Sequence, residues 1–136
     1  MKTHGEIWKH GCNWNRSKNS FYDFIKRKQI VIGTDKFGWN AGDLVMITEG
    51  FKVRAIAMID KKPTAITEKP EYAFLFDEYK IPFEDWVNYT RAEWYELHED
   101  EIFEYAVQRG FAKVRKPDVK NKVVELWKNR RLLELD

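Results

Sequence analysis

Residues 30–59 constrain the fold most, because they hold three apolar runs separated by turns. The runs QIVIG (29–33) and DLVMIT (43–48) are rich in β-branched residues, which favours strands. Glu49-Gly50 predicts a tight hairpin turn into the alternating stretch FKVRAIAMID (51–60). One face of that stretch is expected to carry Phe51, Val53, Ala55, Ala57 and Ile59, and the other Lys52 and Arg54. Small alanines on an inward face indicate a tightly curved sheet or a barrel wall.

The remaining chain mixes further strands with helices. We expect strands at 5–10, 86–97 and 111–115, with a short one within 73–83, and a proline-marked connection at 61–72. We expect helices at 17–29, 99–110 and 117–135. A chain of 136 residues is most simply one domain, residues 1–136. The predicted fold class is α+β, a small and mostly antiparallel β-barrel flanked by helices.

The charges are divided along the chain, although the net charge is only +2. Residues 1–70 carry 13 Lys/Arg against 7 Asp/Glu, residues 71–108 carry 2 against 11, and residues 109–131 carry 9 against 2. If folding brings the basic ends together, they form a face suited to a polyanion. The alternative is an ordinary surface of salt bridges. Within the acidic segment, the cluster ELHEDEIFE (96–104) is interpreted as a solvated helix face, and its functional alternatives are a protein-partner surface or a mask that repels nucleic acid.

The single cysteine and the lack of long apolar runs favour a cytoplasmic location. Cys12 alone cannot form an intrachain disulfide, and no stretch approaches the roughly 20 apolar residues of a membrane span. No signal peptide is expected, and no membrane partner. His10 and Cys12 lie two apart, but only His4 and His98 could add further His donors, so we expect no metal. We expect no cofactor, and the oligomeric state is left open.

The order of motifs along residues 6–63 resembles the PUA-like superfamily, nearest to its EVE and YTH branches. A first strand and a Trp-bearing loop lead to a short helix, then to a strand ending in Gly (IVIG), a Gly-Asp strand (NAGDLVMI) and a hairpin into AIAMIDKKP. The resemblance implies a partly open β-barrel that binds RNA or DNA. The EVE and YTH branches flip a modified base into an aromatic pocket, where aromatic rings take the place of the base's stacking neighbours in the nucleic acid.

Carried onto this chain, the resemblance assigns a base-binding pocket and a set of phosphate contacts. The pocket residues are Trp14, Trp39, Asn13, Asn15, Ser17 and His10. The resemblance makes Trp39 one wall of the pocket and Asn13 or Asn15 the reader of a base edge, with Arg16 and Lys18 holding phosphates. The basic C-terminal segment adds the candidate phosphate contacts Lys116, Lys120 and Arg130. The alternative for Trp39 is a plug at the end of the barrel.

Two other classes of function compete with a non-enzymatic nucleic-acid reader. An ASCH-like nuclease or amidohydrolase acting on a nucleotide or small acyl substrate would need Lys52, Arg54, Asp43 and Glu49 in one cleft. No nucleophile–base pair is recognisable, and Asp43 is better explained as a turn residue that binds backbone amides. A protein-interaction module would use the acidic segment 71–108.

Overall fold

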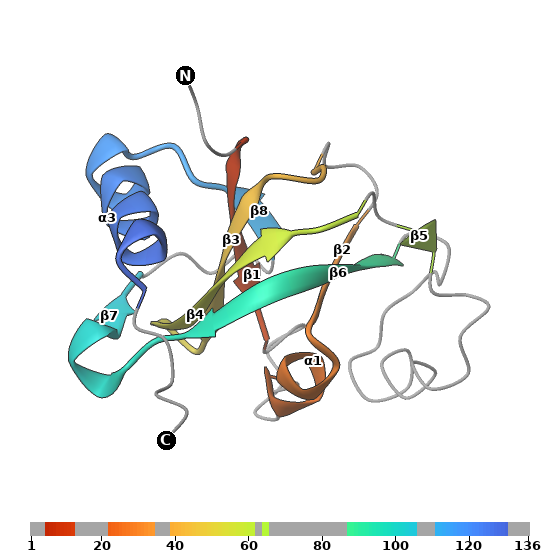
Figure 1. Cartoon of the computed structure of the whole chain (residues 1–136), viewed down its shortest axis with the longest axis horizontal. Helices are drawn as coiled ribbons and strands as arrows, with labels where there is room; N and C mark the ends of the chain where they lie inside the picture. The colour runs from red at the N-terminus through yellow and green to blue at the C-terminus, as the bar shows by residue number, and fades with distance from the viewer. Residues whose placement is uncertain are drawn as a thin grey trace.

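The fold is built on one curled mixed β-sheet with a helix near one end and another against one face (Figure 1). The computed structural model describes residues 5–12, 22–34, 39–61, 64–65, 87–105 and 111–130. The strands are β1 (Ile7–Gly11), β2 (Ile30–Thr34), β3 (Leu44–Glu49), β4 (Lys52–Ile59), β5 (Thr64–Ala65), β6 (Val87–Glu96), β7 (Phe103–Glu104) and β8 (Phe111–Lys113). The helices are α1 (Tyr22–Lys28), the short 3-10 helix η4 (Glu99–Glu101) and α3 (Pro117–Lys128).

The sheet has the strand order β2-β6-β4-β3-β1-β8, with β5 paired to β6 and β7 paired to β4. β1 and β3 run parallel, with Ile7 opposite Leu44 and Gly11 opposite Thr48. The other described pairings are antiparallel. The sheet curls into a half-barrel, which agrees with the α+β class expected from the sequence (Figure 1).

Each face of the sheet packs into its own hydrophobic cluster. The inner cluster includes Trp8, Val45, Ile47, Ala55, Ala57, Ile59 and Ala92, with Tyr22 and Ile25 of α1. The outer cluster includes Ile7, Leu44, Met46, Ile56 and Tyr95, with Val123 and Trp127 of α3. Ala55 and Ala57 are fully buried on the inner face, as expected of small residues where a sheet bends tightly.

A β-bulge at Arg54 corrects the alternation expected for β4. Ile47 of β3 pairs with Ala55 and Thr48 pairs with Val53, which leaves Arg54 as the extra residue. An extra residue shifts the following side chains to the opposite face of the sheet. Val53 accordingly belongs to the outer cluster, whereas Ala55 belongs to the inner one. The prediction that Val53, Ala55 and Ala57 share a face was therefore wrong at Val53.

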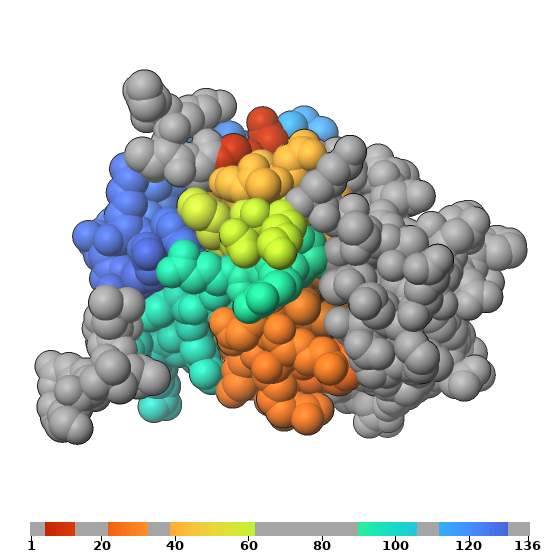
Figure 2. Space-filling view, turned by 45° about the vertical axis from the view of Figure 1, so that its right-hand side comes forward, coloured from red at the N-terminus to blue at the C-terminus, as the bar shows by residue number. Residues whose placement is uncertain are grey.

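Each of the two α-helices packs its apolar residues against a different face of the sheet. α1 supplies the buried Tyr22 and Ile25, and α3 supplies the buried Val123 and Trp127. In Figure 2, the green surface formed by β6, η4 and β7 lies between that of α3 (blue) and that of α1 (orange). Neither helix, nor any other in the described ranges, combines the length and apolar character needed to cross a bilayer.

The helix expected over 99–110 does not form in residues 99–105. One 3-10 turn, η4, is followed by the short strand β7, in which Phe103 pairs with Val53. The side chain of Glu101 accepts hydrogen bonds from the hydroxyl of Tyr95 at 2.7 Å and the backbone N–H of His98 at 2.9 Å. Pairing with β4 outweighs the local helical pattern here. Residues 106–110, and the short strand expected within 73–83, lie outside the described residues.

Candidate functional site

The candidate site is the end of the half-barrel where β1, β3, β4, β6 and α1 meet, which we call the α1 end. The backbone N–H of Cys12 donates to the carbonyl of Thr48 at 3.0 Å, so the end of β1 is fixed beside the end of β3. Cys12 and Tyr22, the residues on either side of the segment 13–21, are both buried in the inner cluster. The segment predicted to carry the base pocket is therefore attached to the α1 end on both sides.

Six of the predicted site residues fall in that segment and lie outside the described residues: Asn13, Trp14, Asn15, Arg16, Ser17 and Lys18. Their roles stay predictions. By sequence, residues 13–21 contain two cations and no carboxylate. Whatever its path, the segment adds positive charge between Cys12 and Tyr22.

Arg54 is the cation at the α1 end that is best positioned to bind a ligand. The bulge releases Arg54 from the regular alternation, and the backbone N–H of Leu97 donates to its carbonyl at 2.9 Å. Its guanidinium carbon lies 4.9 Å from the centre of the Tyr22 ring. Bulges commonly redirect a side chain in this way beside functional sites.

Tyr22 joins the charged residues of this end into one cluster. The Nζ of Lys26 lies 5.8 Å from the centre of its ring, on which Arg54 also lies. Burial raises the pKa of Tyr22, and the nearby carboxylate of Glu96 raises it further. The phenol therefore stays protonated at neutral pH and serves as a neutral platform for cations.

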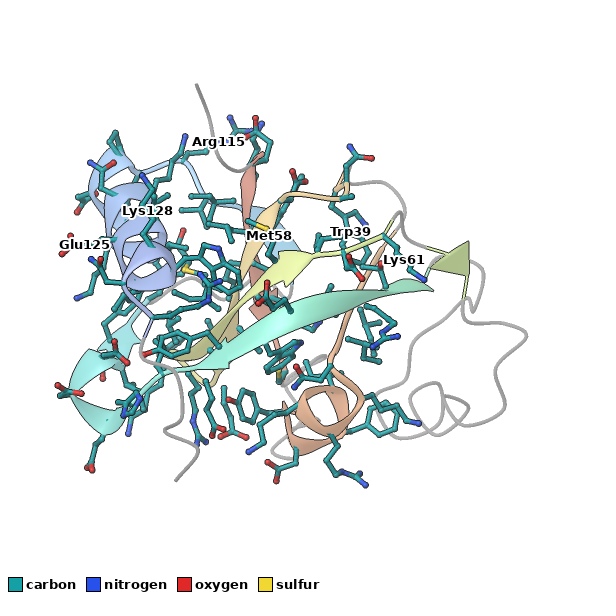
Figure 3. All side chains as sticks on the ribbon, in the orientation of Figure 1. Trp39, Met58, Lys61, Arg115, Glu125 and Lys128 are labelled. Atoms are coloured by element: carbon teal, nitrogen blue, oxygen red, sulfur yellow. The ribbon has the colours of Figure 1, made fainter. Side chains whose placement is uncertain are left out.

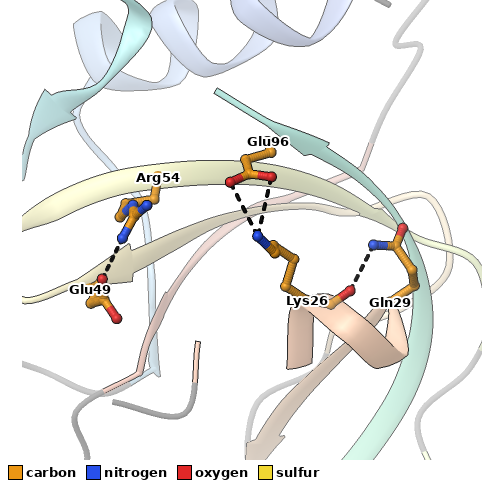
Figure 4. Close-up of polar contacts among 5 residues, drawn as sticks. All are labelled: Lys26, Gln29, Glu49, Arg54 and Glu96. Carbon is orange, nitrogen blue, oxygen red and sulfur yellow. Dashed lines mark hydrogen bonds and ion pairs between the residues drawn. The ribbon is translucent and has the colours of Figure 1, made fainter. Parts of the chain in front are cut away.

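Two ion pairs complete the cluster (Figure 4). Arg54 Nη1 lies 2.5 Å from Glu49 Oε1, and Lys26 Nζ lies 3.4 Å from Glu96 Oε1. Partial burial lowers the pKa of Arg54, but its hydrogen bond to Glu49 and the attraction of that carboxylate outweigh it and raise the pKa overall. The guanidinium of Arg54 thus keeps its charge, and both cations are held in place by carboxylates of the same chain.

A pocket of about 550 Å³ opens beside Arg54. Its lining consists of Glu49, Lys52, Arg54, Glu99, Ile102, Phe103 and Glu104. The cations come from β4 and most of the carboxylates from η4 and β7, and Lys52 is the register partner of Glu104 on the neighbouring strand. Phe51, which is exposed at the tip of the β3–β4 hairpin, directly precedes Lys52 of the pocket lining in the sequence. A cavity of this size accommodates a small ligand such as one nucleotide.

Trp39 does not form the open pocket wall expected from the sequence. Its side chain is 3% exposed and packs in the inner cluster with Trp8. It precedes β3, at the opposite end of that strand from Glu49, and Figure 3 shows it near the same end of the sheet as Lys61. A stacking platform needs an accessible ring face. The alternative weighed for this residue, a plug in the barrel, fits its burial.

His10 is likewise a structural residue rather than an accessible base reader. Its imidazole is fully buried, and Nε2 accepts a hydrogen bond from the backbone N–H of Ile32 at 2.9 Å. Nδ1 lies 2.9 Å from the carbonyl of Gly11 and therefore carries the proton of the neutral ring. Burial lowers the pKa of His10 to about 4.

The predicted phosphate contacts on α3 do not form one cluster. Lys116 is exposed at the N-cap, and Lys120 lies one turn further on. Arg130 follows the other end of the helix, where its guanidinium stacks on Trp127 at 4.1 Å and lies 3.7 Å from Glu93. Figure 3 shows Arg115 and Lys128 as further cations along this region, with Glu125 among them. Arg130 therefore has local structural partners, while Lys116 and Lys120 belong to a separate basic surface.

The enzyme alternative required four residues to converge, and three of them do. Glu49, Lys52 and Arg54 line the same pocket. Asp43 lies before β3, at the other end of the strand, and is buried. Its carboxylate accepts hydrogen bonds at 2.9 Å from the backbone N–H groups of Glu6 and Asn40 and from the indole of Trp8. The interpretation of Asp43 as a turn-closing residue is confirmed.

Two other side chains near the α1 end that could react, those of Cys12 and Lys9, are buried. Burial raises the pKa of the Cys12 thiol well above its usual value, so it remains protonated. Burial lowers the pKa of Lys9, which is 3% exposed. Within the described part of the chain, no group of three or more His, Cys, Asp or Glu could hold a metal ion.

The residues missed by sequence reasoning are Tyr22, Lys26 and Glu96. Lys26 and Glu96 are 70 positions apart, and the expected helix and strand that hold them give no sign of contact. Arg54 was predicted as one of two cations on a strand face and as one of four residues of the enzyme alternative, but not as a partner of Tyr22. A local pattern cannot reveal such pairings, because they depend on the curl of the sheet.

Comparison of the chain with protein-family models, with curated proteins and with solved structures found no significant match.

Proposed function

We propose that this chain is a PUA-like domain that binds single-stranded nucleic acid at the α1 end of its half-barrel. The order of elements supports the assignment: a strand, a short helix, a strand, a Gly-Asp strand and a hairpin, folded into a curled sheet with a helix at one end. In this proposal, the segment between Cys12 and Tyr22 supplies the base pocket, with Trp14 as its stacking residue. Trp39 contributes to the core rather than to the pocket.

The observation that carries the proposal is the gathering of cations from separate elements at one end of the sheet. α1 has Lys26, Arg27 and Lys28 in its last turn, and β4 adds Lys52 and Arg54. By sequence, Arg16 and Lys18 belong to the segment attached to the same end. Carboxylates at the same end offset much of this charge, namely Asp23, Glu49, Glu96, Glu99 and Glu104. A concentration of Lys and Arg at one end is what phosphate binding requires.

The proposal is tested by fluorescence anisotropy with labelled single-stranded RNA and DNA of about ten nucleotides. We expect the affinity to fall steeply between about 50 mM and 200 mM salt, as counterion release requires. Oligonucleotides with and without a methylated base then test whether the pocket reads a modification. The absence of salt-dependent binding by the folded protein at low salt would overturn the proposal.

Two exposed lysines at opposite ends of β4 provide a matched comparison. Lys52 opens the strand at the α1 end, whereas Lys61 follows its other end (Figure 3). Lys52→Ala should reduce the salt slope by roughly 0.7 if the lysine contacts one phosphate of a single strand. Lys61→Ala should leave the slope unchanged.

Trp14 can be tested in the same assay. Trp14→Ala should weaken binding by about 1–3 kcal/mol through the loss of one stacked base. Trp14→Phe should retain most of the affinity, because a smaller aromatic ring still stacks. Equal affinity of the wild type and Trp14→Ala would remove Trp14 from the pocket.

A further inference from the structure

Arg54 is held from two sides while it lines a pocket. Its guanidinium lies on the ring of Tyr22 at 4.9 Å, and its Nη1 contacts Glu49 at 2.5 Å. The side chain is nevertheless 37% exposed. A planar guanidinium that is already oriented and partly desolvated is well suited to bind a phosphate through two parallel hydrogen bonds.

Glu49 occupies the position at which such a phosphate would bind. Its side chain is 32% exposed and lines the same pocket as Arg54. It closes β3 directly before the hairpin turn, where Gly50 has a φ of +61°. An ion pair between two partly exposed groups contributes little to stability. Glu49 can therefore be displaced at low cost, and Arg54 remains supported by Tyr22 when this happens.

The carboxylates that η4 and β7 add to the pocket indicate what the rest of the ligand must offer. Glu99 and Glu104 are exposed carboxylates, and the half-buried ring of Phe103 lies between them in sequence. Carboxylates accept hydrogen bonds from amino and hydroxyl groups and repel a second phosphate. A nucleotide unit suits both kinds of charge, since its phosphate can bind the cations and the donor groups of its base and sugar can bind the carboxylates.

We propose that this pocket binds one nucleotide unit, with its phosphate on Arg54, and that Glu49 is the internal anion that this phosphate displaces. The inference rests on the proposed function for its biological ligand, and it adds a specific binding residue and a competing carboxylate. Lys52, which lines the same pocket, supplies a second positive charge to the phosphate.

The test compares Glu49→Gln with a matched variant of another half-exposed ion pair, Glu6→Gln. Glu6 pairs with Lys113 at 3.1 Å, and the two side chains are 43% and 38% exposed. Oligonucleotide affinity is measured by anisotropy. In parallel, the shift in melting temperature is measured with adenosine 5′-monophosphate and with adenosine, which lacks the phosphate.

Releasing Arg54 should tighten oligonucleotide binding by up to about fivefold, which corresponds to about 1 kcal/mol. Glu49→Gln should also increase the stabilisation by the monophosphate but not by adenosine. Glu6→Gln should behave as the wild type in both assays. Arg54→Gln should lose the monophosphate effect, and its own melting temperature shows whether it is folded.

The two assays separate the inference from the proposed function. If the oligonucleotide binds but Glu49→Gln matches the wild type in both assays, the displacement of Glu49 is refuted and nucleic-acid binding stands. If no oligonucleotide binds, the proposed function is refuted. In that case the monophosphate assay alone decides whether Arg54 and Glu49 form a nucleotide site, and an equal melting shift in Glu49→Gln and wild type overturns it.

Discussion

The imidazole Nε2 of His10 accepts a hydrogen bond of 2.9 Å from the backbone N–H of Ile32. His10 lies on β1 and Ile32 on β2, two strands that are far apart in the sheet order. Their side-by-side approach is a consequence of the curl, which brings β2 toward β1. The buried imidazole of His10 thus accepts the hydrogen bond that the backbone N–H of Ile32 would otherwise donate to a neighbouring strand. This hydrogen bond holds the half-barrel in its curved shape.

The buried His10 should make stability depend on pH in mildly acidic solution. Burial lowers the pKa of His10 from 6.5 to about 4, so the unfolded chain binds a proton in that range and the folded chain does not. Stability is therefore complete above pH 6.5 and is lost as the pH falls toward 4, by roughly 3 kcal/mol from this group. Urea unfolding at a series of pH values measures the loss.

The control separates His10 from the carboxylates that titrate in the same range. His10→Gln keeps a hydrogen-bond acceptor but cannot titrate, so its stability should change less between pH 6.5 and 4. His98→Gln, at an exposed histidine, is the matched control for replacing a histidine with glutamine. A His10→Gln profile as steep as that of the wild type would contradict the neutral, buried imidazole.

Asp43 should be a structural carboxylate whose loss destabilises the fold. Asp43→Asn replaces an oxygen acceptor with an NH₂ donor, although three N–H groups at 2.9 Å point at the carboxylate. At least one buried donor is then left without its acceptor, which costs about 1–3 kcal/mol. Urea unfolding should show this loss, whereas the exposed Asp60→Asn should change stability by less than about 0.5 kcal/mol. A stable Asp43→Asn with impaired turnover of a nucleotide substrate would instead favour the enzyme alternative.

The local elements were predictable because their signals are contained in short stretches of sequence. The alternation in 51–60 and the small Ala55 and Ala57 indicated a curved β4, and the apolar and basic residues around 22–28 indicated α1. β6 and α3 also fall within the ranges expected for them. In each case, one segment carries both the pattern and the turn signals that bound it.

The features that were not predictable depend on interactions between distant segments. The parallel pairing of β1 with β3 has no local signature, and neither does the bulge that moves Arg54 out of register. The helix expected after residue 99 gives way to β7 because Phe103 pairs with β4. The turn residues around Trp39 suggested an open loop, but the curl of the sheet buries its ring in the inner cluster. The candidate site was placed partly on residues that the fold uses for packing.

Trp39 should therefore affect stability before it affects ligand binding. Trp39→Ala removes a large buried side chain and should cost about 3–5 kcal/mol, measured by urea unfolding. Phe51→Ala, at a side chain that is 46% exposed, should cost less than about 0.5 kcal/mol. A fully stable Trp39→Ala that no longer binds oligonucleotides would refute the place of Trp39 in the core and support its predicted role in the binding pocket.

The cations of α3 should divide into one residue that supports the fold and two that are available to phosphate. Arg130 stacks on Trp127 and donates to its carbonyl at 2.7 Å, so Arg130→Gln should lower stability by about 1 kcal/mol without changing the salt dependence of binding.

Lys116 and Lys120 lie one turn apart at the start of the same helix. If nucleic acid extends from the α1 end across α3, the double variant Lys116→Ala/Lys120→Ala should lower the salt slope by roughly 1.4, or about 0.7 for each phosphate that is no longer neutralised. Lys128→Ala, at an exposed lysine in the last turn, is the matched control for the loss of a helix-surface charge. An unchanged slope in the double variant would confine phosphate binding to the α1 end. The surface of α1 lies apart from that of α3 (Figure 2).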